Sequence, residues 1–282
     1  MPGSAAQRHD EMVRAYDAQR SRLRMQGGDD RWSASAQRFR LDPRRPMDAL
    51  LSGIGAFIET GDVLLDVGGG AGRLSLPFAD RCKEIVDIEP SQGMGEAFLA
   101  SATEAGIANA RLITADWLGA PPVEGDVSLV ANVTYFVPEI VPFVERLVLA
   151  SRRRVIIAVA STPPPNQGAA LFRVVNGHDQ ALVPGHSELL PVLWEMGVLP
   201  DVRVLAAPGR GTAILGRSHP TREATIESAL GADAPENDAG REAARQRVEA
   251  AFDELFERTG EVYRLRLVPE PRVMLITWEP GA

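Results

Sequence analysis

The spacing of apolar residues changes near residue 62. Before it, Met12, Val13, Tyr16 and Leu23 lie near one face of a helix predicted over residues 8–24. After it, short continuous apolar runs alternate with helical stretches, as expected of strands buried on both faces of a sheet. The predicted strands cover 63–67, 84–88, 110–115, 126–132 and 154–160. This alternation predicts a parallel sheet with helices on both faces.

The chain after residue 160 has a mixed pattern. Residues 161–168 have the composition of a loop, 186–197 predict a helix, 202–207 predict a strand and 211–216 are a candidate strand. Two helices are predicted over about 221–230 and 241–258, and the second has one apolar face. Residues 262–278 predict two extended segments around the prolines at 269 and 271, which suggests an antiparallel strand at one edge of the sheet.

A glycine-rich loop follows the first strand. Residues 63–79 read VLLDVGGGAGRLSLPFA, and a helix is predicted after the glycines, restricted by Pro77. Such a loop lets ligand atoms approach the backbone closely. A phosphate-binding P-loop needs a lysine at its end, but the only lysine of the chain is Lys83. A dinucleotide-binding loop needs glycine or alanine where this chain has Arg73.

The spacing Asp66-x-Gly68-x-Gly70-x-Gly72 resembles the first motif of class I S-adenosylmethionine-dependent methyltransferases. In that family an acidic residue after the second strand holds both ribose hydroxyls, and Glu89 stands there, nineteen residues after Gly70. One carboxylate offers two acceptors to a vicinal diol. Glu89 also begins the family form Glu-Pro-Ser-x-x-Met, which includes Pro90 and Met94.

The resemblance continues after the third and fourth strands. The family has an Asp that accepts from the adenine amino group, and the resemblance gives this role to Asp116, beside Trp117. Trp117 could instead be a core residue. The loop at 131–136 then corresponds to the one that faces the transferred methyl group, with Asn132 among the expected cofactor-binding residues. The resemblance covers about residues 45–160 and extends to the C-terminal strand pair.

The resemblance implies a Rossmann-like α/β fold. It predicts a seven-stranded, mostly parallel sheet with an antiparallel edge strand, helices on both faces, N-terminal helices and a C-terminal helical insertion. The expected parts are an N-terminal helical lid (1–45), a cofactor-binding core (46–217), the insertion (218–260) and C-terminal strands completing the core sheet (261–282).

Candidates for catalytic residues are few, and the general base, if there is one, is unknown. Tyr135 is one candidate, and His178 follows the fifth strand, at the correct end of the sheet for a base, although a surface histidine is the alternative. Asn132 resembles the first residue of the Asn-Pro-Pro-Tyr motif of amino-group methyltransferases, but Val133 and Thr134 replace both prolines. The pocket beside the methyl group is expected to be walled by Tyr135, Phe136, the 161–185 segment and at least one helix from 1–45 or 218–260.

Composition disfavours several classes of partner. The net charge is −8, which disfavours nucleic-acid binding. The one arginine run, residues 152–154, is expected to be the solvated end of a helix before a strand. Cys82 is the only cysteine, and the four histidines have no metal-site spacing. No signal-peptide core or membrane-spanning stretch is present in the sequence, so a cytoplasmic location is expected.

These expectations combine into one functional hypothesis. The chain is expected to bind S-adenosylmethionine and to transfer its methyl group to a small-molecule acceptor by in-line displacement. Two alternatives stay open: an RNA or protein methyltransferase, and a cofactor-binding factor without catalysis. No motif identifies the acceptor, the atom that is methylated or the oligomeric state.

Overall fold

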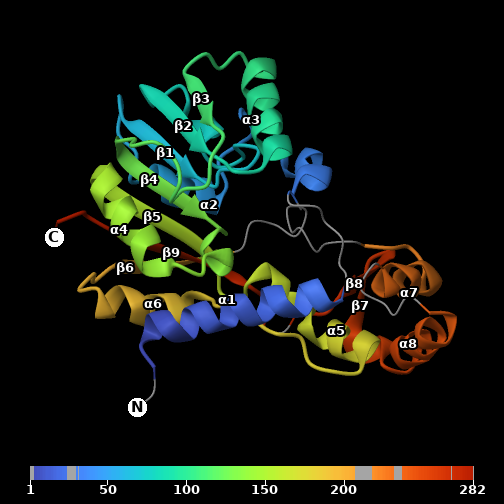
Figure 1. The fold of residues 1–282 in the computed structure, drawn as a ribbon. Helices are drawn as coiled ribbons and strands as arrows, with labels where there is room; N and C mark the ends of the chain where they lie inside the picture. Colours follow the sequence, from blue (N-terminus) through green and yellow to red (C-terminus); the bar gives the residue numbers. More distant parts are fainter. Residues whose placement is uncertain are drawn as a thin grey trace.

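The computed structural model describes residues 3–23, 30, 32–206, 218–231, 237–267 and 269–281. Within these residues, seven strands form the main sheet. Their order is β3-β2-β1-β4-β5-β9-β6 (Figure 1). The strands are β1 (Val63–Val67), β2 (Glu84–Ile88), β3 (Ala110–Ile113), β4 (Gly125–Ala131), β5 (Ser151–Ala160), β6 (Asp201–Ala206) and β9 (Arg272–Trp278). The predicted α/β class is confirmed.

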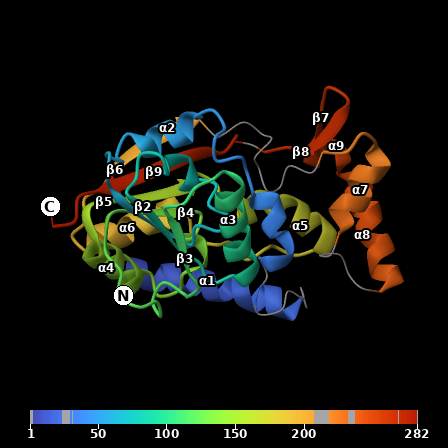
Figure 2. The same ribbon diagram turned by 90° about the horizontal axis from the view of Figure 1, so that it is seen from above.

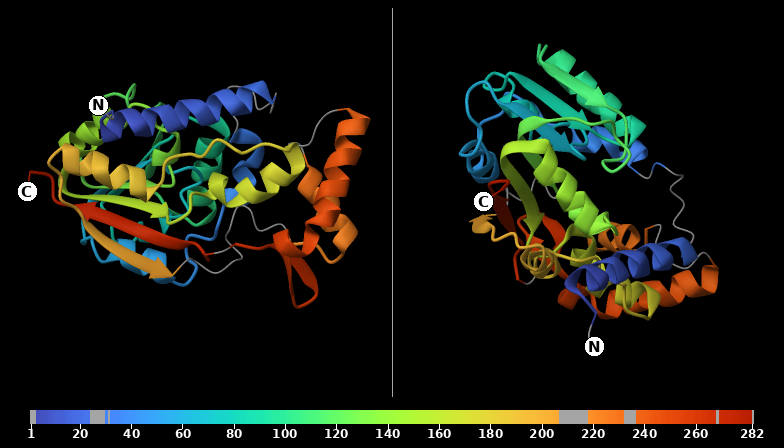
Figure 3. Two further views of the ribbon diagram at one scale, coloured as in Figure 1. Left: turned by 90° about the horizontal axis from the view of Figure 1, so that it is seen from below. Right: turned by 60° about the vertical axis from the view of Figure 1, so that its left-hand side comes forward.

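The sheet is parallel from β3 to β5. The β9 strand runs antiparallel to both neighbours, β5 and β6, and is therefore the antiparallel strand, one position inside the edge (Figure 3, left). The strand order reverses between β1 and β4, which both lie at the centre of the sheet. In open α/β sheets ligands bind at this reversal point, beyond the carboxyl ends of the strands.

Two apolar cores cover the two faces of the sheet, because successive strand residues point to opposite sides. Leu65 and Val67 face a core formed with α1 (Ala5–Arg22), α4 (Ile140–Ala150) and α6 (His186–Glu195). Leu64 faces the other core, formed with α2 (Ala49–Gly55) and α3 (Gln92–Glu104). The expected helices on both faces are therefore present.

A separate unit carries the C-terminal helices. It contains α7 (Arg222–Leu230), α8 (Asp238–Ala250), α9 (Phe252–Leu255) and a hairpin of β7 (Phe256–Thr259) and β8 (Val262–Leu265). Its apolar cluster also includes Val175 of α5 (Ala169–Asn176), which joins it to the rest of the molecule. Figure 2 shows α5 between the sheet and the pair α7–α8.

Two predictions about this C-terminal part were wrong. The helix predicted to residue 258 ends at Leu255, because Phe256–Thr259 turns back through Gly260, with φ 61°, and pairs with β8. Of the 261–282 segment, only β9 completes the core sheet, since β8 pairs with β7 instead. The candidate strand at 211–216 lies outside the described residues.

Short 3₁₀ segments occur at several connections. The helix expected after the glycine loop is only the turn η2 (Leu76–Phe78), in which Pro77 interrupts regular helical hydrogen bonding. The others are η1 (Ser33–Phe39), η3 (Thr134–Phe136) and η4 (Pro164–Gly168).

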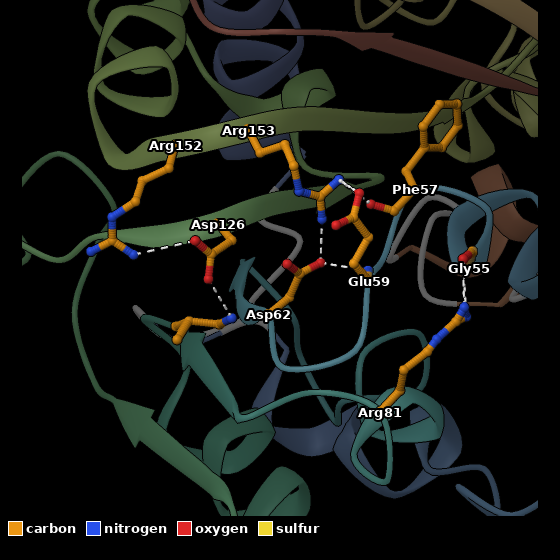
Figure 4. Close-up of polar contacts among 9 residues, drawn as sticks. Gly55, Phe57, Glu59, Asp62, Arg81, Asp126, Arg152 and Arg153 are labelled. Carbon is orange, nitrogen blue, oxygen red and sulfur yellow. Dashed lines mark hydrogen bonds and ion pairs between the residues drawn. The ribbon is translucent and has the colours of Figure 1, made fainter.

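The arginine run lies within β5, not at a helix end, which corrects the expectation. Arg153 pairs with Asp62 and Glu59 and donates to the Phe57 carbonyl at 3.1 Å, and Arg152 pairs with Asp126 (Figure 4). Arg154 pairs with Glu279 at 2.6 Å. These ion pairs lie at the amino end of a parallel strand, which is the end opposite to the glycine loop.

Candidate functional site

A cavity of about 420 Å³ lies beyond the carboxyl ends of β1, β2 and β4. Ligand sites in proteins commonly span about 300–1,000 Å³. Of the sequence-predicted residues, the structure places eight on its wall: Gly68, Gly70, Glu89, Pro90, Met94, Asp116, Trp117 and Asn132. Asp66 lies within β1 and Gly72 packs against Phe98 and Leu76, and neither lines the cavity.

The glycine loop is packed tightly on one side and open on the other. A Cβ atom on Gly69 would lie 2.6 Å from Asp87 Oδ1 and would also overlap the Asp66 carboxylate. Gly70 has φ 62°, and the nearest atom to its would-be Cβ is Met94 Sδ at 3.7 Å. Gly69 therefore fits only as glycine, while Gly70 leaves its backbone open to the cavity.

The Glu89 carboxylate is fixed between the loop and the start of α3. Its Oε2 accepts from the Gly70 backbone N–H at 2.9 Å, and its Oε1 accepts from the Ser91 N–H at 2.8 Å. Burial raises the pKa of Glu89, and these two hydrogen bonds oppose the shift. Each carboxylate oxygen keeps acceptor capacity for a second donor, such as a hydroxyl in the cavity.

Two buried carboxyl groups, those of Asp66 and Asp87, pack against the glycine loop. Asp66 and Asp87 are register partners on β1 and β2, and both are buried. Asp87 Oδ1 accepts from the Gly69 N–H at 3.1 Å, but Oδ2 of each residue has no hydrogen-bond partner among the described residues. Burial raises the pKa of both groups, that of Asp66 to about 7. The pair therefore favours retaining a proton.

Asp116 and Trp117 line the cavity from the segment after β3. Asp116 is exposed, and its Oδ1 accepts from the Leu118 N–H at 2.9 Å, which fixes the turn after β3. Trp117 is 3 % exposed, and its indole N–H donates to the Phe143 carbonyl at 3.2 Å. Trp117 therefore belongs to the core and also presents part of its ring to the cavity.

Asn132 has the only positive φ, 60°, among the described non-glycine residues. Its Oδ1 accepts from the Tyr135 hydroxyl at 3.3 Å, and that hydroxyl accepts from the Ala160 N–H at 2.5 Å. Left-handed backbone at a non-glycine residue is strained and is found preferentially at functional sites. The Tyr135 hydroxyl holds the loop after β4 in this conformation.

The two candidate catalytic residues do not line the cavity. Tyr135 is 1 % exposed, and burial raises its pKa. His178 is exposed, with one ring nitrogen 3.2 Å from the Asp179 carbonyl and its ring against Phe172. The structure therefore brings neither side chain to the cavity surface.

Aromatic rings close the cavity on the side of the N-terminal segment. The Phe136 ring centroid lies 5.8 Å from that of Trp32, which in turn lies 5.9 Å from that of Phe39. The expected wall from Phe136 and the 1–45 region is thus present. No residue of 161–185 or of the described part of 218–260 lines this cavity, which corrects the other half of that expectation.

Sequence reasoning missed several wall residues. Arg73 lines the cavity, and its guanidinium makes no hydrogen bond or ion pair with the described residues. The position of Arg73 directly after the glycine loop could have indicated that it lines the cavity, because the loop itself does so. Trp32 and Phe39 reach it from a distant segment, which local patterns do not reveal.

Comparison with solved structures identifies the fold. A candidate methyltransferase from Bacillus halodurans aligns with a TM-score of 0.55 at 12% identity, covering 82% of this chain and 97% of its own. The YcgJ protein of Bacillus subtilis aligns with a TM-score of 0.51 at 15% identity, covering 83% and 98%. An S-adenosylmethionine-dependent methyltransferase from Geobacter sulfurreducens, in complex with S-adenosylhomocysteine, aligns with a TM-score of 0.50 at 19% identity, covering 88% and 96%.

The chain therefore has the fold of S-adenosylmethionine-dependent methyltransferases. No protein-family model and no curated protein matches the sequence. Within the described ranges, no group of three or more His, Cys, Asp or Glu side chains could hold a metal ion. Among the same residues, no helix is long and apolar enough to cross a membrane.

Proposed function

We propose that this chain binds S-adenosylmethionine in the cavity beyond β1, β2 and β4 and transfers its methyl group to a small-molecule acceptor. The observation that carries the proposal is Glu89, whose carboxylate is held at the cavity wall by the Gly70 and Ser91 N–H groups. A fixed carboxylate with two remaining acceptor positions suits the two hydroxyls of a ribose. The Geobacter protein of the same fold binds S-adenosylhomocysteine.

The other cavity residues suit the rest of this molecule. The Gly70 backbone admits close approach of the ligand, and the exposed Asp116 can accept from the adenine amino group beside the Trp117 ring. The Arg73 guanidinium, which makes no hydrogen bond with the described residues, can pair with a carboxylate of the ligand. Phe136 presents an aromatic ring, whose face attracts a cation such as a sulfonium.

When bound, S-adenosylmethionine supplies a methyl group that an acceptor lone pair takes up while the carbon–sulfur electron pair leaves to sulfur and the acceptor releases its proton. The protein's part is alignment. Asn132, held by Tyr135, fixes the loop after β4, and Phe136 shapes the space beside it. Holding reactants in line is a large contribution to rate, since it removes orientational freedom before the reaction.

The small-molecule assignment rests on charge and enclosure. The arginine run is paired with carboxylates at the amino end of β5, and the cavity is walled by the rings of Trp32 and Phe39. A nucleic-acid substrate would need several unpaired cations around the cavity to neutralise phosphates, whereas the described wall has one arginine, Arg73, and three carboxylates, Glu89, Asp116 and Glu139. We assign the parts of the chain outside the 46–217 core, residues 1–45 and 218–260, to the shaping of the acceptor site.

Calorimetric titration with S-adenosylhomocysteine tests the proposal, with NADH as the comparison ligand. We expect binding of S-adenosylhomocysteine and none of NADH, because Arg73 stands where a dinucleotide loop needs a small residue. Absence of heat and of thermal shift at millimolar S-adenosylhomocysteine would refute it.

A further inference from the structure

A second cavity of about 440 Å³ lies between α1, α5 and the C-terminal helical unit. Its wall includes an apolar surface formed by Leu171, Phe172, Val175, Phe256 and Leu265. These residues come from segments far apart in the sequence, the α5 region and the β7–β8 hairpin. Figure 2 shows α5 beside the end of α1, with α7 and α8 beyond it. The cavity has the size and apolar surface of a small-molecule site.

The charged groups of this second cavity are all basic. Its described wall includes Arg20 and Arg38 but no aspartate or glutamate, although the whole chain has 38 acidic and 30 basic residues. Arg20 donates to the Tyr16 hydroxyl at 3.3 Å, which leaves its other N–H groups available. Arg38 makes no hydrogen bond or ion pair with the described residues. An anionic group is therefore the complement of this wall.

His219 adds an unsatisfied polar group. Its backbone is fixed by reciprocal hydrogen bonds with Tyr263, at 3.2 and 2.8 Å. Its Nε2 is buried and has no hydrogen-bond partner among the described residues. Because a buried polar atom without a partner is costly, a polar atom of a ligand in this cavity would be stabilising.

Aromatic rings separate the two cavities. Tyr16 lines the second cavity, and its ring centroid lies 6.4 Å from that of Phe136, which lines the first. Likewise η1 contributes Phe39 to the first cavity and the next residue back, Arg38, to the second. At this point the two cavities are therefore separated by two contacting side chains, those of Tyr16 and Phe136.

We infer that the second cavity holds the body of the methyl acceptor, and that this acceptor is an amphiphilic anion: an apolar skeleton bearing an acidic group such as a carboxylate or phosphate. The apolar skeleton packs on Leu171 and Phe172, and the acidic group pairs with Arg20. This inference rests on the proposed function, since the acceptor's role requires a methyl donor in the first cavity.

Calorimetry with three ten-carbon probes tests the chemistry of the cavity: decanoate, decyl phosphate and decyltrimethylammonium. We expect the two anions to bind and the cation to bind at least about tenfold more weakly, as loss of a charge-assisted hydrogen bond implies. Equal affinity of cation and anions would overturn the inference. S-adenosylhomocysteine is titrated separately, so that its failure to bind refutes the proposed function without deciding the anion result.

Variants locate the probe. Arg20→Gln should weaken decanoate binding about tenfold and leave S-adenosylhomocysteine binding unchanged. Arg14→Gln is the matched control, because Arg14 lies on the same helix, is paired with Asp10 and does not line the cavity. Leu171→Trp should fill the cavity and abolish decanoate binding, with folding checked by thermal unfolding. Unchanged decanoate affinity in a folded Arg20→Gln or Leu171→Trp variant would contradict the site.

A crystal structure with 10-bromodecanoate and S-adenosylhomocysteine gives an independent readout. The inference predicts an anomalous bromine peak in the cavity beside Phe172, with the carboxylate on Arg20. A peak elsewhere on the molecule would contradict it. Label transfer from radioactive S-adenosylmethionine to a mixture of apolar acids, but not to the matching apolar amines, would support the acceptor role, and the reverse would overturn it.

Discussion

Glu89 Oε2 accepts a hydrogen bond of 2.9 Å from the backbone N–H of Gly70. This contact joins the end of β2 to the loop after β1, two segments that pack side by side because β1 and β2 are neighbours in the sheet. The glycine loop and the carboxylate are therefore one structural unit, and the second oxygen extends it to Ser91 at the start of α3.

We predict that Glu89→Ala weakens S-adenosylhomocysteine binding by about 1–3 kcal/mol, because hydrogen bonds to a charged group are lost. Calorimetry on the folded variant measures this. Glu84→Ala is the control, since Glu84 lies at the opposite end of the same strand and pairs with Arg111 at 2.8 Å. Equal affinities of the wild type and Glu89→Ala for S-adenosylhomocysteine would show that Glu89 does not bind the ribose.

Gly70→Ala should weaken ligand binding beyond its effect on stability. The left-handed backbone costs an L-residue about 1–2 kcal/mol, and the new methyl group would lie 3.7 Å from Met94 Sδ, on the cavity wall. Gly106→Ala is matched, with φ 67° and nothing within 4 Å of its would-be Cβ. We expect similar losses of stability in chemical denaturation, but lower S-adenosylhomocysteine affinity only in Gly70→Ala. Equal affinities of the two variants for S-adenosylhomocysteine would show that the ligand does not approach the Gly70 backbone closely.

The Asp66–Asp87 pair predicts a pH dependence. Burial raises both pKa values, that of Asp66 to about 7, so the folded state binds more protons than the unfolded state from the ordinary carboxyl pKa up to at least about 7. The contribution of this pair to the free energy of unfolding is therefore present at low pH, and it is lost as the pH rises through this window. Asp87→Asn removes one charge and keeps an acceptor for the Gly69 N–H.

Denaturant titrations should show Asp87→Asn gaining stability relative to the wild type when the pH is raised from 5 to 8. Asp80→Asn is the control, because Asp80 is exposed and its pair with Arg44 is at the surface. A difference in stability between wild type and Asp87→Asn that is the same at both pH values would contradict the raised pKa values of this pair.

Tyr135→Phe should reduce stability by about 1–3 kcal/mol, since the part-buried Ala160 N–H loses its acceptor. S-adenosylhomocysteine affinity should also fall, because Asn132, which this hydroxyl holds, lines the cavity. Tyr263→Phe serves as the control for the loss of a hydroxyl. A Tyr135→Phe variant with wild-type stability would show that this hydroxyl does not hold the loop.

The sequence predicted the features that local patterns determine. Five of the core strands were predicted from their apolar runs, and the glycine spacing identified the loop after the first of them. Eight of the residues expected from these motifs line the same cavity. Contacts between distant segments were not predictable: Trp32 and Phe39 reach the cavity through the course of the N-terminal chain. The β7–β8 hairpin replaced a predicted helix because tertiary pairing outweighs helical periodicity at Phe256.

The position of His178 has a similar cause. The sequence places it after β5, at the cavity end of the sheet, but α5 carries the chain away toward α7 and α8, and the ring packs on Phe172. A residue near the end of a strand lies at the site only if the following segment stays there.

The most direct measurement is a crystal structure of the protein with S-adenosylhomocysteine. The account predicts the ligand in the cavity beyond β1, β2 and β4, with both ribose hydroxyls on the Glu89 carboxylate, the adenine beside Asp116 and Trp117, and the sulfur toward Phe136. A ligand bound outside this cavity, or one whose ribose makes no contact with Glu89, would contradict it.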